Sequence, residues 1–124
     1  MVPVELAARR YIEIWSERDR TARAVLLEAC FASTGRLVGR GRTLHGRAEV
    51  AALIERLLAD PRGFTVRVTS VIDAGGTTFR FRSQGGFGDG SGAFEALDVG
   101  EVDAEGRIAV LYAFTGPLAD APAP

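Results

Sequence analysis

The sequence contains no lysine, and cysteine, histidine, methionine and tryptophan occur once each. Without lysine, Schiff-base chemistry on a lysine side chain is impossible. A single cysteine excludes an internal disulfide, and one histidine with one cysteine cannot supply the three or four protein ligands of a typical zinc site. The sequence also lacks a GxSxG motif, a Walker phosphate loop and a dinucleotide fingerprint. We therefore expect no metal and no cofactor, which leaves carboxylates, tyrosine, histidine and arginine for any chemistry.

No apolar run is long enough to span a bilayer, and the opening stretch MVPVELAARR is amphipathic rather than typical of a secretory signal. The 15 arginines oppose 16 acidic residues, which gives a formal net charge of -1 and a sequence pI near 5.8. These values give no electrostatic reason to bind nucleic acid or an anionic membrane. We expect a cytoplasmic protein with neither partner.

The length of 124 residues and the apolar content of 47% are typical of one globular domain with a single core. The last eight residues, PLADAPAP, contain too few bulky apolar side chains to pack against that core. We assign residues 1–116 to one domain and residues 117–124 to a flexible tail.

The first half of the chain has helical periodicity. Val4, Ala8, Tyr11 and Trp15 follow one stripe and predict a helix over residues 4–16 whose inward face includes Tyr11. Asp19 is a suitable N-cap for a second helix over residues 20–31. A third helix is predicted over residues 47–59, while residues 35–38 favour a short strand followed by a glycine- and arginine-rich loop.

From residue 64 onward the period changes to two, which predicts strands over residues 64–72, 77–83, 93–102 and 107–114. Turn-forming glycines lie at residues 73–76, 85–92 and 103–106. Helices followed by a meander of strands indicate an α+β fold in which three helices pack on one face of a strongly curved, mixed or antiparallel sheet. Such a sheet leaves a cone-shaped cavity suited to a ligand.

Asp98 is the anomaly in this pattern. Phe94, Ala96 and Asp98 share one face of the predicted strand, so a carboxyl group continues an apolar row. Burial of a carboxyl group is costly and raises its pKa. One explanation is a working acid at the floor of a pocket. The other is a structural carboxylate that is hydrogen-bonded to backbone or paired with an arginine.

Three stretches carry a resemblance to a known family: RYIEIW at 10–15, HGRAEVAAL at 45–53 and ALDVGEVDAEGRIAVLYAF at 96–114. In order and spacing the chain resembles the NTF2-like superfamily, in the branch of ketosteroid isomerases and SnoaL-like polyketide cyclases. The resemblance implies that Tyr11 donates a hydrogen bond to a substrate oxygen and that Asp98 is the carboxylic acid beside it. Gly39 stands where the isomerases have their proton-shuttling aspartate. SnoaL-like cyclases, with one aspartate acid/base and no cofactor, fit that difference better.

The resulting hypothesis is a cofactor-independent isomerase or cyclase that binds a small apolar carbonyl compound, such as a polyketide, terpenoid or steroid-like ring. Asp98 would exchange the proton and Tyr11 would stabilise the enolate. The alternative is a non-catalytic ligand-binding or dimerisation module, which Gly39 favours. His45 is explained either by the geometry at the start of the third helix or by contact with the ligand. The expected ligand-binding residues are Trp15, His45, Phe79, Phe81, Phe94 and Leu111.

Apolar residues of the last two strands also point away from the proposed cavity. Left uncovered, they would form a large apolar patch in water. We therefore expect a homodimer formed through the outer face of the sheet. The residues of this face are Leu97, Val99, Val110, Tyr112 and Phe114.

Overall fold

The computed structural model describes residues 2–123 and begins with two helices, α1 (Pro3–Ile14) and α2 (Arg20–Cys30). Proline stands in the first turn of α1, where its missing N–H removes no helical hydrogen bond. The Asp19 carboxylate accepts a hydrogen bond from the Ala22 backbone N–H at 3.3 Å, which confirms the predicted N-cap. Helix α2 ends one residue earlier than expected, because Phe31 already belongs to a strand.

The third helix, α3 (Arg47–Ala59), is joined to α2 by an ion pair. Nε and Nη2 of Arg23 donate to the two oxygens of the Glu55 carboxylate, at 2.9 and 2.8 Å. The remaining nitrogen, Nη1, donates to the backbone carbonyls of Glu17 and Arg18. This fork geometry holds the α1–α2 connection and α3 in one arrangement.

The sheet has seven strands, six of them in the order β2-β1-β7-β6-β5-β3. The seventh strand, β4, pairs with the first residues of β5, whereas β3 pairs with its last residues. Strands β1 and β7 are parallel, whereas the other neighbours are antiparallel, so the sheet is mixed. The strands are β1 (Phe31–Gly39), β2 (Arg42–His45), β3 (Phe64–Val68), β4 (Asp73–Gly75), β5 (Thr78–Phe87), β6 (Phe94–Val102) and β7 (Ile108–Thr115).

Two loop predictions are corrected by strand pairing. The glycine- and arginine-rich stretch after residue 38 contains β2, which forms a hairpin with β1 through pairs from Arg36↔His45 to Gly39↔Arg42. Its polar composition resembles a loop because both strands of this hairpin have a largely exposed side. The predicted turn at residues 85–92 also begins later, since β5 extends to Phe87.

The long strand predicted over residues 64–72 is interrupted. Between the pairs Val68↔Ser83 and Asp73↔Arg80, the four residues 69–72 lie opposite only two residues of β5. The Ser70 hydroxyl accepts the hydrogen bond of the Arg82 backbone N–H at 2.8 Å, in place of a backbone carbonyl. The chain then rejoins β5 as β4, where the sequence predicts a turn.

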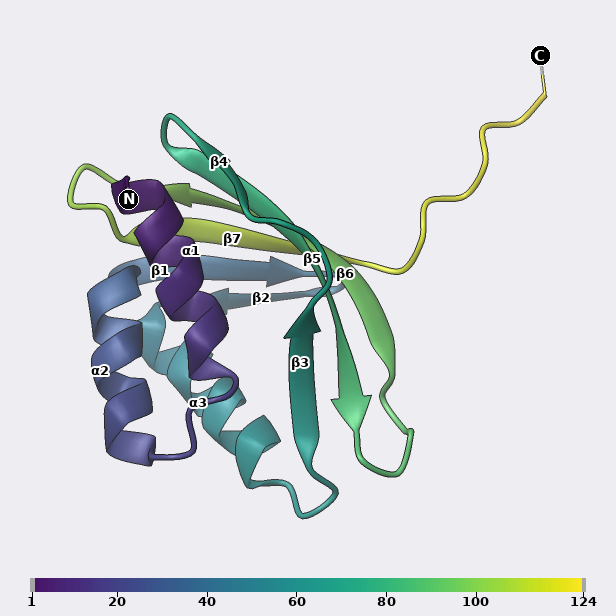
Figure 1. The fold of residues 1–124 in the computed structure, drawn as a ribbon, viewed down its shortest axis with the longest axis horizontal. Coiled ribbons are helices and arrows are strands. Elements are labelled where there is room, and N and C mark those ends of the chain that lie inside the picture. Colours follow the sequence, from purple (N-terminus) through teal and green to yellow (C-terminus); the bar gives the residue numbers. More distant parts are fainter. Residues whose placement is uncertain (1, 124) are drawn as a thin grey trace.

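Figure 1 shows the three helices together on one face of the sheet, which confirms the α+β class. The core lies between these layers and includes Ala8, Phe31, Val50 and Ile108, all of which are essentially inaccessible to solvent. Residues 117–123 form no helix or strand and extend away from the sheet (Figure 1). Within residues 2–123, no helix combines the length and the apolar character needed to cross a membrane.

Gly100 of β6 gives a test of how rigid the core is. It pairs with Phe79, and a Cβ atom at Gly100 would overlap the buried Phe79 ring. Because the Phe79 ring is buried and stacked on Phe81, we expect Gly100→Ala to lower the free energy of unfolding by about 1–3 kcal/mol or more. Gly75→Ala is the matched control, since its Cβ would meet nothing within 4 Å, and it should change stability by less than about 1 kcal/mol. Equal urea midpoints for the two variants would contradict this packing.

Candidate functional site

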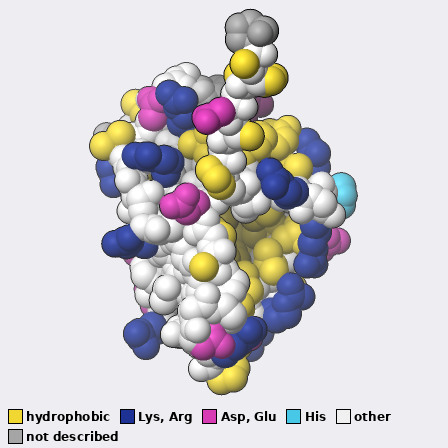
Figure 2. Space-filling view, turned by 90° about the vertical axis from the view of Figure 1, so that its right-hand side faces the viewer, with side chains coloured by type: hydrophobic (Ala, Val, Ile, Leu, Met, Phe, Trp, Pro, Cys, Tyr) yellow, Lys and Arg dark blue, Asp and Glu magenta, His cyan; other side chains and the backbone are white. Residues whose placement is uncertain are grey.

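A cavity of about 140 Å³ lies between α1, α3 and the helix-covered face of the sheet. Figure 2 shows it from outside as a hollow lined by hydrophobic side chains. An apolar cavity of about 150 Å³ is large enough to admit benzene, so this one has room for about one ring. The apolar part of its wall consists of Ile12, Trp15, Leu37, Leu53, Phe64, Val66, Val68, Phe81, Phe94, Ala96 and Ala113.

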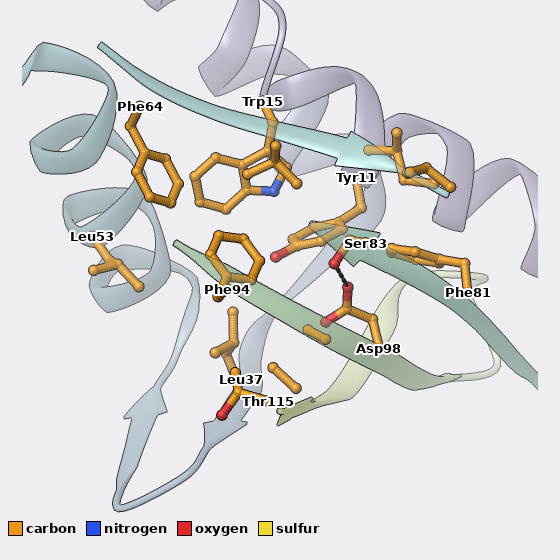
Figure 3. A pocket seen from close by; sticks show the side chains of 15 residues that line it. Tyr11, Trp15, Leu37, Leu53, Phe64, Phe81, Ser83, Phe94, Asp98 and Thr115 are labelled. Carbon is orange, nitrogen blue, oxygen red and sulfur yellow. Dashed lines mark hydrogen bonds between the residues drawn. The ribbon is translucent and has the colours of Figure 1, made fainter. Parts of the chain in front are cut away.

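Four side chains with hydroxyl or carboxyl groups complete the lining: Tyr11 of α1, Ser83 of β5, Asp98 of β6 and Thr115 of β7. The strand register brings two of them together. Phe81 pairs with Asp98 and Ser83 with Ala96, so Ser83 and Asp98 are diagonal neighbours on the cavity side of adjacent strands. Figure 3 shows the two groups in contact, with the Tyr11 phenol on the neighbouring wall.

Asp98 is 8% exposed, and its Oδ2 accepts a hydrogen bond from the Ser83 hydroxyl at 3.0 Å. Burial raises the pKa of the Asp98 carboxyl to about 6, while the hydrogen bond from Ser83 opposes this rise. No ion pair or backbone hydrogen bond within residues 2–123 involves the Asp98 side chain. The explanation of Asp98 as the partner of an arginine or of backbone is therefore wrong.

Tyr11 is 6% exposed and packs edge-on against Trp15, with ring centroids 6.4 Å apart. Burial raises the pKa of the Tyr11 phenol, and the negative charge of Asp98 raises it further. The phenol is therefore protonated at any physiological pH. It is a hydrogen-bond donor at the cavity wall and cannot serve there as a base.

Aromatic rings close the outer part of the cavity. Phe64 of β3 is central to this cluster, with ring centroids 5.9 Å from Trp15, 6.0 Å from Phe94 and 5.1 Å from Phe87. Such offset and edge-to-face contacts fix the rings relative to one another. A flat apolar ligand would therefore meet a preformed aromatic surface.

Five of the predicted site residues line this cavity: Tyr11, Trp15, Phe81, Phe94 and Asp98. Their roles in binding or catalysis remain predictions, because position alone does not test them.

Three residues that were expected to bind the ligand do not line this cavity: Phe79, Leu111 and His45. The predicted wall positions of Phe79 and Leu111 are therefore corrected. Phe79 and Leu111 belong to the inward rows of β5 and β7 but lie deeper, in the core, at 2% and 0% exposure. His45 is exposed on β2, and its backbone N–H donates to the Glu49 carboxylate at 2.9 Å. This contact supports the first explanation of His45, in which the residue serves the geometry at the start of α3.

Sequence reasoning missed Ser83, although a signal for it was present. Phe79, Phe81 and Ser83 alternate along β5, so a small polar residue continues an apolar row just as Asp98 does on β6. The strand register that brings Ser83 next to Asp98 could not be predicted from the sequence. Leu37, Leu53 and Phe64 were missed because each comes from a different element, and only the packing brings them together.

Within the described residues, no group of three or more His, Cys, Asp or Glu side chains is placed to hold a metal ion. The lining contains a single carboxyl group. Mechanisms that use a pair of carboxylates on opposite sides of a substrate, as in glycoside hydrolysis, therefore have no second partner in this cavity.

The protein is an α+β protein in which helices cover a mixed sheet and enclose an apolar cavity with one buried carboxyl group. Comparison with known proteins identifies its family. Residues 8–111 match the family described as the SnoaL-like domain. The chain therefore belongs to the SnoaL-like domain family of the NTF2-like superfamily. Comparison with functionally described protein sequences finds no significant match.

Solved structures agree with this assignment. A candidate isomerase of the SnoaL-like family from Agrobacterium tumefaciens is 26% identical, with a TM-score of 0.77 over 94% of this chain and 100% of that one. A candidate ketosteroid isomerase from Kribbella flavida is 19% identical, with a TM-score of 0.72 over 98% and 83%. A candidate polyketide cyclase from Sinorhizobium meliloti is 16% identical, with a TM-score of 0.68 over 86% and 92%. The last two likenesses show the fold alone.

The buried Asp98 carboxyl predicts an unusual dependence of stability on pH. Because its pKa is about 6 in the folded chain and near 3.8 when unfolded, the folded state binds the proton more tightly, and stability from this group falls as pH rises from about 4 to about 6. Asp98→Asn removes this penalty. We expect the variant to be more stable than wild type at pH 8, by at most about 3 kcal/mol, and to lose that advantage near pH 4.

Urea denaturation at several pH values measures this difference. Asp73→Asn is the matched control, because Asp73 is exposed and its ion pair with Arg80 lies at the surface. A large loss of stability in Asp98→Asn at pH 8 would show that the carboxylate is needed for folding, contrary to the expectation.

Proposed function

We propose that the protein is a cofactor-independent acid/base enzyme, an isomerase or a cyclase, that acts on a small apolar carbonyl compound bound in the cavity. Asp98 would move the proton and Tyr11 would stabilise the negative charge on the carbonyl oxygen. The observation that carries the proposal is the placement of one buried, titratable carboxyl group in an apolar cavity beside a phenol that stays protonated.

The ionisation of Asp98 suits a general base. A base works best when its pKa lies near the working pH, because it is then both ionised and able to hold a proton. With a pKa of about 6, Asp98 is largely a carboxylate at pH 7. It could take a proton from the carbon next to the carbonyl group and return it elsewhere on the same molecule. This favours a proton-transfer role for Asp98 over a permanently protonated acid.

Tyr11 suits the complementary role. When the proton leaves carbon, its bonding electrons become an enolate, whose negative charge is concentrated on the former carbonyl oxygen. A preorganised donor in a site shielded from water stabilises that charge more than it stabilises the neutral carbonyl. The buried Tyr11 hydroxyl is such a donor.

The size of the cavity narrows the ligand class. Room for about one ring favours a single-ring ketone, or a larger molecule of which only one ring enters while the rest remains in the mouth. A compact four-ring steroid does not fit inside without opening the aromatic cluster around Phe64. Terpenoid or small polyketide fragments are the better match among the classes expected from the sequence.

Arginines at the edge of the hollow support a ligand with an oxygen-rich end. Figure 2 shows dark blue side chains along one side of the hollow, all of them arginine because the sequence has no lysine. On the hairpin that contributes Leu37 to the wall, Arg36 alternates with Leu37 and points to the opposite face. Arg40 and Arg42, at the tip of this hairpin, are exposed and form no ion pair within residues 2–123. Their charge favours a carbonyl or carboxylate group at this end.

Gly39 supports the alternative, a module that binds a ligand without converting it. The glycine follows Leu37 on the same face of β1, at the position where the isomerases have their proton-shuttling aspartate. A Cβ atom there would meet only the Arg42 carbonyl oxygen, at an ordinary 3.6 Å. Packing therefore does not require glycine, and a cavity retained only for binding would tolerate this residue.

The conversion of cyclohex-3-enone to the conjugated cyclohex-2-enone, followed by ultraviolet absorbance, tests the proposal with a single-ring substrate. The proton leaves the carbon between the carbonyl group and the double bond and returns at the far end of the dienolate. We expect wild type to catalyse this step and Asp98→Asn to lose about a hundred- to ten-thousand-fold in kcat. Tyr11→Phe should lose less, about a hundredfold, because only one donor is removed.

Asp73→Asn is the control for the substitution itself and should retain wild-type turnover, since Asp73 lies on β4 and does not line the cavity. Binding of the enone without turnover by wild type would favour the non-catalytic module. Full activity in Asp98→Asn would exclude the assigned base.

We also propose that the protein is a homodimer formed through the uncovered face of the sheet. Tyr112 and Phe114 of β7 stack at 6.3 Å, and Leu97 of β6 is paired with Phe114 across the strands. The three are 36–58% exposed, on the face opposite the helices. A two-fold axis through this patch would cover it with its own copy.

Sedimentation equilibrium at micromolar concentration should give twice the chain mass of 13.2 kDa. Phe114→Glu places a charge in the patch and should give the monomer. Val25→Glu is the control, because Val25 is 63% exposed on α2, which covers the opposite face of the sheet, and its replacement should leave the dimer intact. A wild-type monomer would contradict the proposed interface.

A further inference from the structure

We propose that Ser83 is a positioning residue for Asp98. Its hydroxyl donates a hydrogen bond to Oδ2 of Asp98, which leaves Oδ1 as the atom that exchanges the proton with the ligand. The assignment rests on the proposed function for the role of Asp98 as a base. The contact itself is independent of that function.

The geometry is a short, buried contact between two adjacent strands. The Ser83 hydroxyl donates to Oδ2 of Asp98 at 3.0 Å, and the two residues are 3% and 8% exposed. Both side chains belong to the cavity lining, and Figure 3 shows the carboxyl group with one oxygen toward Ser83. Within residues 2–123, Ser83 is the only group that donates a hydrogen bond to this carboxyl group.

The backbone around Ser83 is held from both sides. Ser83 pairs with Val68 of β3 and with Ala96 of β6, so it lies in the interior of the sheet. Next to it, the Arg82 backbone N–H donates to the Ser70 hydroxyl at the interruption between β3 and β4. A functional group on such a rigid element is placed more accurately than one on a loop.

One hydrogen bond has two consequences for the carboxyl group. An acceptor oxygen that already binds a hydroxyl hydrogen is the less favourable site for an added proton, so the proton goes to Oδ1. The bond also stabilises the ionised form more than the neutral form, and it therefore counteracts the effect of burial on the Asp98 pKa. Ser83 keeps the base ionised near neutral pH.

The proton transfer then balances on named atoms. The bond between hydrogen and the carbon next to the carbonyl breaks, and an Oδ1–H bond forms on Asp98. The electron pair of the broken bond becomes part of the enolate, whose oxygen accepts a hydrogen bond from Tyr11. In the return step Oδ1–H gives the same proton back to carbon, and Asp98 is again a carboxylate. The Ser83 hydrogen remains on Ser83 throughout.

A carboxyl ¹³C NMR titration of selectively labelled protein tests the assignment directly. The Asp98 signal is identified by its absence in Asp98→Asn, and its pKa is then measured in wild type and in Ser83→Ala. We expect Ser83→Ala to raise the Asp98 pKa by about 1, because a hydrogen bond to a charged acceptor typically has that effect. Ser83→Thr retains the hydroxyl and should return the pKa toward the wild-type value.

The pH profile of kcat/KM for cyclohex-3-enone provides a second measurement that a purely structural role would not change. Its rising limb should follow the NMR titration in each protein, so that Ser83→Ala requires a pH about 1 unit higher for half-maximal activity. Ser83→Thr should return the rising limb to its wild-type pH. If Ser83→Ala changes only the maximal kcat/KM and leaves the pH of half-maximal activity unchanged, the assignment is overturned.

An unchanged Asp98 pKa in Ser83→Ala would also overturn the assignment, whatever the activity. Absence of turnover in wild type would instead overturn the proposed function. The NMR titration would then still decide whether Ser83 controls the ionisation of Asp98. If Ser83→Ala fails to fold, the comparison of wild type with Ser83→Thr remains, and a raised pKa in a folded Ser83→Thr would count against the hydroxyl contact.

Discussion

The function proposed for the cavity depends on a single costly arrangement, the burial of the Asp98 carboxyl group among apolar side chains. Transfer of an ionised carboxylate away from water destabilises the folded state unless hydrogen bonds compensate, and here one hydroxyl, that of Ser83, provides the compensation. The same burial gives the group its titration near neutral pH. Stability and the proposed proton transfer therefore make opposite demands on this residue.

The inward rows of the strands serve both as core and as cavity wall, and the difference is depth along each strand. On β5, Phe79 is packed in the core while Phe81 and Ser83 face the cavity; on β7, Leu111 is buried while Ala113 and Thr115 line the wall. On these two strands, small residues replace large ones toward the open end. The space in the cavity thus arises from side-chain volume, and Phe64 closes its outer part together with Trp15 and Phe94.

Much of the fold was predictable because its signals are local. The stripe of α1, the Asp19 cap and the two-residue period of β6 each depend on neighbours in sequence, and they correctly placed Tyr11 and Asp98 on inward faces. The strand β2 was missed because a short, half-exposed strand with arginine and glycine has the composition of a loop. Ser83 was missed because its importance depends on the register between β5 and β6, which no local pattern contains.

The parallel pairing of β1 with β7 has a consequence for how the chain is made. Leu37 pairs with Leu111 and Val38 with Tyr112, so β1, the third element of the chain, finds its inner neighbour only in the last element, β7. Closing so long a loop costs entropy before any contact is gained, and such topologies fold slowly. On the ribosome, the β1–β2 hairpin must wait with one edge open until β7 has emerged. Folding of this domain therefore depends on synthesis of β7, and a nascent chain stalled before β7 would present an unpaired strand to other chains.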